Sequence, residues 1–234
     1  MKKKLKPRRR LRIKVVLILL LSIYCTARIC IFVYNLPVSS LIVTGNTFLS
    51  DAYIQEASNV NSNTNFYIIK ENDIKKKLDK RKFIKESSVE KNYITREISI
   101  KIQENKILFF NTYDNSYILE DGTEVKEKQS LIVPTIINYI PDQIYAKFIN
   151  KISEIENQLI LKISEVEYSP TIKNNIILDE ERFIFKMNDG NTVHINIDNI
   201  EKFSKYNKIM EIQSSKGTLY LDSSNDGVIF EVYE

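Results

Sequence analysis

Residues 41–50 read LIVTGNTFLS, a stretch that holds three successive structural signals. The short run Ser40–Val43 is apolar and β-branched, which is typical of a strand. The Gly45-Asn46 pair follows almost at once, and because both residues accept a positive φ, it predicts a tight turn. Ser50 then stands where its hydroxyl can cap a short helix that runs through Ala57. The stretch therefore predicts a strand, a turn and the start of a helix.

Downstream residues extend this pattern into a domain that ends near residue 104. A second helix is expected over Asn72–Arg81, with an apolar stripe on one face, and a strand over Ser87–Tyr93. Glu97–Glu104 alternates polar and apolar residues at every position, as a strand with one buried face does. Residues 36–104 are thus predicted to form a three-stranded sheet with two helices on one face, in the order β-α-α-β-β.

Residues 105–234 are predicted to form a second, β-rich domain with two helices, which makes the chain an α+β protein. The expected helices are Asp142–Glu156 and Ile200–Met210. Apolar runs and turn residues predict the following strands: Ile107–Tyr113, Ser116–Leu119, a run that ends at Val133-Pro134, Ile160–Tyr168, Phe183–Met187, Thr192–Ile197, Gly217–Asp222 and Gly227–Tyr233.

Upstream of the decisive stretch, the chain has the pattern of a membrane anchor. The first fourteen residues carry nine positive charges and no acidic residue, and an apolar run from Val15 to Tyr34 follows. A helix needs about 20 residues to cross the hydrocarbon core. Because a cationic flank stays in the cytoplasm, we expect residues 1–14 inside, residues 15–34 as a transmembrane helix and the rest outside. Arg28 lies in the outer third of the run, where it can snorkel to the headgroups or face a partner helix.

Other interpretations of the N-terminus fit less well. A cleaved signal peptide needs a small-x-small site, and Thr26-Ala27-Arg28 is a poor one. A lipoprotein signal needs small residues before its cysteine, whereas Tyr24 precedes Cys25. A basic run can bind nucleic acid, but its direct contact with an apolar segment makes membrane topology the simpler cause.

The charge and cysteine content of the external part limits which partners and which chemistry it can have. Without the nine tail charges and Arg28, the 34 Lys and Arg residues fall to 24 against 30 Asp and Glu, a net charge of −6. Such a mixed, mildly acidic surface lacks the basic patch that nucleic-acid binding requires. Both cysteines, Cys25 and Cys30, lie in the apolar run, so the exterior has no disulfide and no thiol nucleophile.

Candidate catalytic residues are few. The single histidine, His194, falls among polar neighbours on an alternating strand, which favours a surface residue over a general base. One histidine and no external cysteine rule out a Ser-His-Asp triad and a His/Cys metal cluster. The acidic run Asp179-Glu180-Glu181 is interpreted as a solvated loop, while a Ser-Lys dyad or a carboxylate pair stays open. We therefore expect no catalytic, cofactor-binding or metal-binding residue.

Six segments together resemble the FtsQ/DivIB family of bacterial cell-division proteins. They are Leu41–Ser50, Lys82–Lys91, Ile98–Glu104, Asn115–Val125, Val133-Pro134 and Lys216–Asp222. The resemblance covers essentially the whole chain and implies a membrane helix, a POTRA domain and a larger β domain. The sequence departs from the family pattern in two places. The proline common after the third POTRA strand is missing after Glu104, and the glycine common after the Leu-Pro pair is missing after Val133-Pro134.

The resemblance implies a function without catalysis. It suggests a scaffold of the divisome at the septum that holds FtsL and FtsB/DivIC-like proteins and, through them, influences the septal peptidoglycan synthase and its transpeptidase. Two other classes stay open: another membrane-anchored POTRA protein in envelope transport, and a membrane-anchored envelope enzyme.

Two surfaces suit such a scaffold: the membrane helix, and the final hairpin, which leaves an edge strand open to β-augmentation by a partner. Matching the family's closing strands onto this chain selects these candidate partner-binding residues: Leu219, Tyr220, Leu221, Val228, Ile229, Phe230 and Tyr233. The competing interpretation is that this hairpin is merely the last piece of the core.

Overall fold

The computed structural model describes residues 13–213, 215–222 and 228–233, and its chain divides into two compact units. Helix α1 (Ile13–Tyr34) opens the first unit. It has a mean hydropathy of 2.4 and is long and apolar enough, by length and composition, to cross a membrane. Residues 1–12, most of the basic tail, lie outside the described residues.

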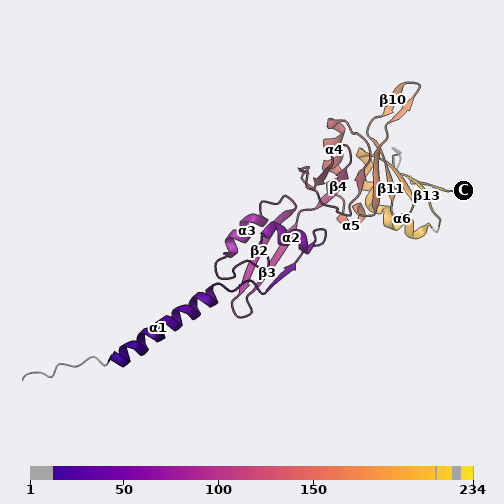
Figure 1. The fold of residues 1–234 in the computed structure, drawn as a ribbon. Coiled ribbons are helices and arrows are strands. Elements are labelled where there is room, and N and C mark those ends of the chain that lie inside the picture. The colour runs from indigo at the N-terminus through magenta and orange to yellow at the C-terminus, as the bar shows by residue number, and fades with distance from the viewer. Residues whose placement is uncertain (1–12, 214, 223–227, 234) are drawn as a thin grey trace, which may run out of the picture. The chain divides into compact units, whose positions relative to one another are not determined.

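The rest of the first unit has the predicted β-α-α-β-β order. Its elements are β1 (Ser40–Thr44), α2 (Asp51–Ser58), α3 (Glu71–Leu78), β2 (Ile84–Asn92) and β3 (Glu97–Glu104). The sheet order is β1-β3-β2, and β1 runs parallel to β3 with Leu41 opposite Ile98. Figure 1 shows β2 and β3 beside the helices α2 and α3. This arrangement confirms the fold class expected from the sequence.

Local signals explain how this unit begins. Gly45 has a φ of +85°, and a Cβ at this position would overlap the carbonyl oxygen of Ile102 on β3. The side chain of Asn46 donates a 2.8 Å hydrogen bond to Asp51, at the start of α2. The Ser50 hydroxyl accepts a 3.2 Å hydrogen bond from the Tyr53 amide and caps the helix as predicted.

One face of the three-stranded sheet is buried. On β3, Ile98 and Ile100 are inaccessible to solvent, while Lys101 on the opposite face is exposed. Ile54 of α2 and Ile74 of α3 are likewise fully buried. Burying such side chains contributes about 1.5–3 kcal/mol each relative to exposure. The two helices therefore hold their places by covering the apolar face of this sheet.

The second unit is built on a nine-stranded sheet with the order β14-β13-β12-β11-β8-β7-β4-β5-β6. In chain order its strands are β4 (Ile107–Asn111), β5 (Ser116–Leu119), β6 (Glu124–Val125), β7 (Thr135–Ile136), β8 (Ile163–Tyr168), β11 (Arg182–Met187), β12 (Thr192–Asn196), β13 (Gly217–Tyr220) and β14 (Ile229–Val232). The helices are α4 (Asp142–Ser153), α5 (Asn157–Ile160), the 3-10 helix η1 (Ile197–Lys205) and α6 (Tyr206–Ile212). A separate hairpin of β9 (Thr171–Lys173) and β10 (Ile176–Asp179) completes it.

The β domain differs from its sequence prediction in several places. The helix expected over Asp142–Glu156 is α4 and ends at Ser153, and a separate short helix, α5, which was not predicted, follows it. The helix expected over Ile200–Met210 is divided into η1 and α6. The run before Val133-Pro134 forms no strand over residues 126–134, and the strand β7 begins after the proline instead. Because proline lacks an N–H, it suits the end of such a loop better than a strand interior. The hairpin β9–β10 was not predicted.

Aromatic side chains fill the core between the helices and one face of the large sheet. Phe148 of α4 stacks on Phe183 of β11 with ring centroids 4.3 Å apart. Phe203 of η1 meets Phe185 edge to face at 5.4 Å. Because side chains alternate along a strand, Arg182 and Ile184, which alternate with Phe183 and Phe185 on β11, point to the opposite face.

Candidate interaction surface

Strand β14 lies at one end of the nine-stranded order. It pairs antiparallel with β13, with Leu219 opposite Phe230 and Thr218 opposite Glu231. Among the described strands, none pairs with its other side. β14 is therefore an edge strand, the kind of element that accepts an additional strand from a partner.

The hydrogen-bond alternation of an antiparallel pair shows which backbone groups of this edge are open. The Tyr233 amide donates a 3.0 Å hydrogen bond to the carbonyl oxygen of Lys216. Successive residues of a strand point their N–H and C=O groups in opposite directions, so Glu231 and Ile229 also face β13. It follows that the backbone N–H and C=O groups of Phe230 and Val232 point to the open side.

The predicted partner-binding residues do not form one surface. The side chains of Leu219 and Leu221 are 0% and 1% exposed and belong to the core. Strand β13 lies between β12 and β14, so its backbone is already paired on both sides. The open edge thus narrows to β14 and its flanking residues, with Val228, Ile229 and Tyr233 exposed and Phe230 packed partly on the core.

Side-chain hydrogen bonds fasten β14 to its neighbours. The Tyr233 hydroxyl donates a 2.7 Å hydrogen bond to the Thr192 hydroxyl on β12. The Tyr220 hydroxyl donates a 3.1 Å hydrogen bond to Glu231, and this bond to a carboxylate raises the pKa of the tyrosine. An edge held in this way is preorganised, which lowers the entropy cost of adding a strand.

His194 lies on the helix-free face of the same sheet, as the alternation predicted, but it is half-buried. Its Nδ1 accepts a hydrogen bond from the guanidinium of Arg182, which also forms a 2.7 Å ion pair with Asp222. The imidazole packs edge to face on Tyr220 at 4.8 Å. Burial, and then the charge of Arg182, lower the pKa of His194. The histidine is therefore held in its neutral form as part of a packed polar cluster.

The acidic run expected as a solvated loop, Asp179-Glu180-Glu181, begins with the last residue of β10 and ends just before β11. Its members have separate partners: Asp179 accepts a 2.9 Å hydrogen bond from the Glu181 amide, and Glu181 pairs with Lys147 of α4. Lys147 also pairs with Asp198 at 3.2 Å. These ion pairs, the first above all, raise the pKa of Lys147. Within residues 13–213, 215–222 and 228–233, no group of three His, Cys, Asp or Glu residues is placed to hold a metal ion.

The hairpin β9–β10 is an apolar surface that the sequence reasoning missed. It projects from the rest of its unit (Figure 1), and four of its side chains are about 60% exposed: Ile172, Ile176, Ile177 and Leu178. Asn174 and Asn175 at its tip have φ values of +51° and +61°, as a type I′ turn requires. The Asn-Asn pair between two β-branched runs was the signal that could have predicted it.

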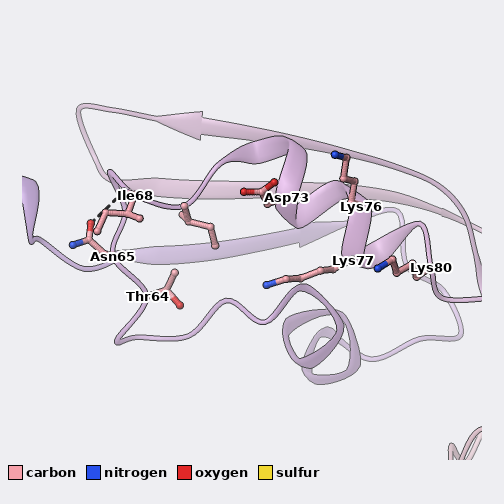
Figure 2. Close-up of a pocket in the computed structure, with 8 residues that line it drawn as sticks. Thr64, Asn65, Ile68, Asp73, Lys76, Lys77 and Lys80 are labelled. Atoms are coloured by element: carbon pink, nitrogen blue, oxygen red, sulfur yellow. Dashed lines mark hydrogen bonds between the residues drawn. The ribbon is translucent and has the colours of Figure 1, made fainter.

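The first unit contains an open groove of about 550 Å³. Figure 2 shows Thr64, Asn65 and Ile68 gathered at one end of this groove, with Lys76 of α3 and Lys80, in the turn after α3, at the other. The Asn65 side chain accepts a hydrogen bond from the Ile68 amide at 3.3 Å. Lysine side chains on an open helix face are ordinary solvated groups, so the groove alone does not define a ligand site.

Comparisons with known proteins give matches to one segment of the chain and to most of its length. Residues 36–105 match the family model of the POTRA domain, FtsQ-type. The chain is 27% identical to the cell division protein DivIB of Geobacillus kaustophilus, over 94% of this chain and 86% of that protein. It is 25% identical to DivIB of Bacillus anthracis over 80% of this chain and 71% of that one.

Solved structures also match. One of them is the major extracytoplasmic domain of DivIB from Geobacillus stearothermophilus, with a TM-score of 0.37 and 22% identity over 46% of this chain and 92% of that domain.

The fold thus defines a POTRA protein with a candidate N-terminal membrane helix and a β-rich second domain. Within that class, the chain is similar over most of its length to bacterial cell-division proteins named DivIB, and its residues 36–105 match the POTRA domain of the FtsQ type.

Proposed function

We propose that this protein is a non-enzymatic scaffold of the bacterial divisome at the septum. Its helix α1 anchors it in the cell membrane with the N-terminus in the cytoplasm and the two folded units outside. It binds FtsL and FtsB/DivIC-like proteins and, through them, acts on the septal peptidoglycan synthase and transpeptidase. The similarity to cell-division proteins named DivIB and the apolar helix support this proposal.

The observation that carries the binding role is the open edge of β14. A partner strand pairs with the free N–H and C=O groups of Phe230 and Val232, so that the sheet gains another strand. The side chain of Ile229, 59% exposed, supplies an apolar anchor beside this pairing. Main-chain hydrogen bonds give the affinity, and side chains on alternate positions give the specificity.

A matched pair of substitutions tests the edge. Val232→Pro removes an N–H that points to the open side and leaves the bonds between β14 and β13 in place. Val232→Thr changes the same side chain but keeps the N–H. In the full-length protein, the proline variant is expected to lose co-purification with an FtsL/FtsB-like pair, whereas the threonine variant keeps it.

Folding of each variant is checked by thermal melting. As a further control, Ile229→Pro removes an N–H that faces β13, so it is expected to lower the melting temperature more than Val232→Pro does. If Val232→Pro melts normally and still binds the pair, partner docking does not use this edge.

Membrane topology and location are tested separately. In wall-stripped cells, external protease is expected to digest the chain from about residue 36 onward and to leave a membrane fragment. Protection of the C-terminal part would overturn the orientation. A fluorescent protein fused to the cytoplasmic N-terminus is expected to form a midcell band in dividing cells, and uniform membrane fluorescence would contradict the septal role.

A further inference from the structure

Two loops of the first unit are hydrogen-bonded to the short segment that follows α1. One loop precedes α3, and the other is the turn between β2 and β3. The bonds are Phe66 N–H to Leu36 O at 3.0 Å, Val38 N–H to Thr64 O at 2.8 Å, Ser39 N–H to Arg96 O at 2.9 Å and Arg96 Nη1 to Pro37 O at 3.0 Å. Both loops are therefore fixed to residues 36–39.

The length of this segment limits the distance of the loops from the membrane. Helix α1 ends at Tyr34, and Pro37 lies three residues further along the chain. At no more than about 3.6 Å per residue, Pro37 lies within roughly 11 Å of the helix end. The headgroup layer on each side of a bilayer is about 5–7 Å thick. If α1 spans the membrane, as in the proposed function, both loops lie at or beside the headgroups.

The tips of the two loops carry large side chains that stay more than half exposed. Ile94, in the turn between β2 and β3, is 94% exposed, and its neighbour Tyr93 is 61% exposed. Ile68, at the end of the groove in Figure 2, is 54% exposed. Tyrosine is enriched at membrane interfaces, and the transfer of exposed isoleucine side chains out of water is energetically favourable.

Lys91 joins the two loops into one platform. Its ammonium group donates hydrogen bonds to the carbonyl oxygens of Phe66 and Ile69, the latter at 2.9 Å. It also lies 4.4 Å from the ring centre of Phe66 and 5.2 Å from that of Tyr93. Because Lys91 belongs to β2 and its acceptors to the other loop, the loop that contains Ile68 is fixed to the strand end that carries Tyr93.

We propose that Ile68, Tyr93 and Ile94, here called the membrane-contact tip, insert into the headgroup layer of the outer leaflet. The partner of this surface is the phospholipid bilayer itself. Three large, exposed side chains in two loops tied to the end of the membrane helix fit a lipid interface, and the same tether brings that interface within reach. The tip seats the POTRA domain on the membrane instead of leaving it to swing about the end of α1. The inference rests on the proposed membrane anchor.

The test uses the full-length protein in phospholipid vesicles that contain a spin-labelled lipid as a fluorescence quencher. Cys25→Ser and Cys30→Ser remove the native thiols, and single cysteines for a small fluorophore are then placed at three isoleucines. Ile94→Cys reports on the tip, and Ile18→Cys reports on insertion of α1. Ile132→Cys is the matched control, since Ile132 of the second unit is also 94% exposed.

We expect the labels at positions 94 and 18 to lose most of their fluorescence and the label at 132 to keep it. If the label at 18 is quenched and the label at 94 is not, α1 is in the membrane but the tip does not contact lipid. The tip would then face water or a partner protein, and the inference would be overturned. If neither the label at 94 nor the label at 18 is quenched, the proposed membrane anchor is overturned as well. Equal quenching at 94 and 132 would show unspecific adsorption and contradict the inference. In the Ile94→Asp variant, a label at Ile68→Cys is expected to be quenched less.

Discussion

Gly217 of β13 faces the backbone of Glu231 on β14 so closely that a Cβ at position 217 would overlap the glutamate's carbonyl oxygen. The same Cβ would lie 2.8 Å from Cζ of Phe230, the ring that packs partly on the core. The edge strand can therefore reach its place only because residue 217 has no side chain.

This relationship predicts that Gly217→Ala displaces β14. The added methyl group cannot be accommodated without a backbone shift, so we expect the free energy of unfolding to fall by about 1–3 kcal/mol. Thermal melting measures the loss, and hydrogen exchange of the β14 amides locates it. Thr218→Ala, on the next residue, is the control and should change little. Unchanged melting and exchange in Gly217→Ala would contradict the close contact.

A second prediction concerns the turn at Gly45. In Gly45→Val, a β-branched residue has to adopt a positive φ, and its Cβ overlaps the carbonyl oxygen of Ile102. We expect this variant to destabilise the first unit by roughly 1–3 kcal/mol or more. Gly45→Asn separates the two causes, because asparagine accepts positive φ but still carries a Cβ. If the overlap dominates, both variants melt at similarly lowered temperatures. If Gly45→Asn melts like the wild type, the overlap is relieved by a small backbone adjustment.

A third prediction concerns Glu104 at the end of β3. Its carboxylate accepts backbone hydrogen bonds from Thr47 at 3.0 Å and Leu49 at 2.8 Å, and from Phe48 between them. Glu104→Gln turns one acceptor oxygen into an NH₂ group that faces these donors. Hydrogen bonds to a charged group are worth more than neutral ones, so we expect a loss of about 1–3 kcal/mol.

Glu97→Gln at the other end of the same strand is the control for Glu104. Its carboxylate accepts a 3.2 Å hydrogen bond from the Ser40 hydroxyl at an exposed site, so its loss should be small. Equal melting temperatures for the Glu97 and Glu104 variants would show that the carboxylate of Glu104 does not hold the turn.

The elements that the sequence predicted well are those with local signals. Gly45, Ser50 and the alternation of Glu97–Glu104 act within a few residues, and the structure has the turn, the cap and the strand at those positions. The end of α4 was predicted at Glu156 instead of Ser153, because Ile155 keeps the helical spacing of apolar residues beyond the true end of the helix. Periodicity indicates which side chains are buried, but it does not fix where a helix ends.

The candidate site was only partly predictable because strand pairing is non-local. The closing strands were expected from their apolar runs, yet nothing in residues 217–222 indicates that β13 pairs parallel with β12. That pairing places Leu219 in the core and leaves β14 as the edge. In the same way, the contact of Arg182 with His194 joins two strands whose residues carry no mutual sequence signal.

The last prediction concerns pH and His194. Burial and the neighbouring Arg182 charge lower its pKa below the ordinary value of 6.5. The unfolded chain then binds more protons than the folded one between the two pKa values, so stability rises with pH through that window. The contribution of neutral His194 is complete above about pH 6.5 and is lost as the pH falls through the lowered pKa.

Because the chain contains a single histidine, no other imidazole titrates in this range. We therefore expect the melting temperature of the wild type to fall as the pH is lowered from 7.5 to 5. His194→Gln keeps an acceptor for Arg182 but cannot be protonated, so its melting temperature should depend less on pH over the same range. The decisive quantity is the difference between the two curves, since carboxylates titrate in both proteins. Parallel curves would mean that the folded protein binds the proton at His194 as readily as the unfolded chain does.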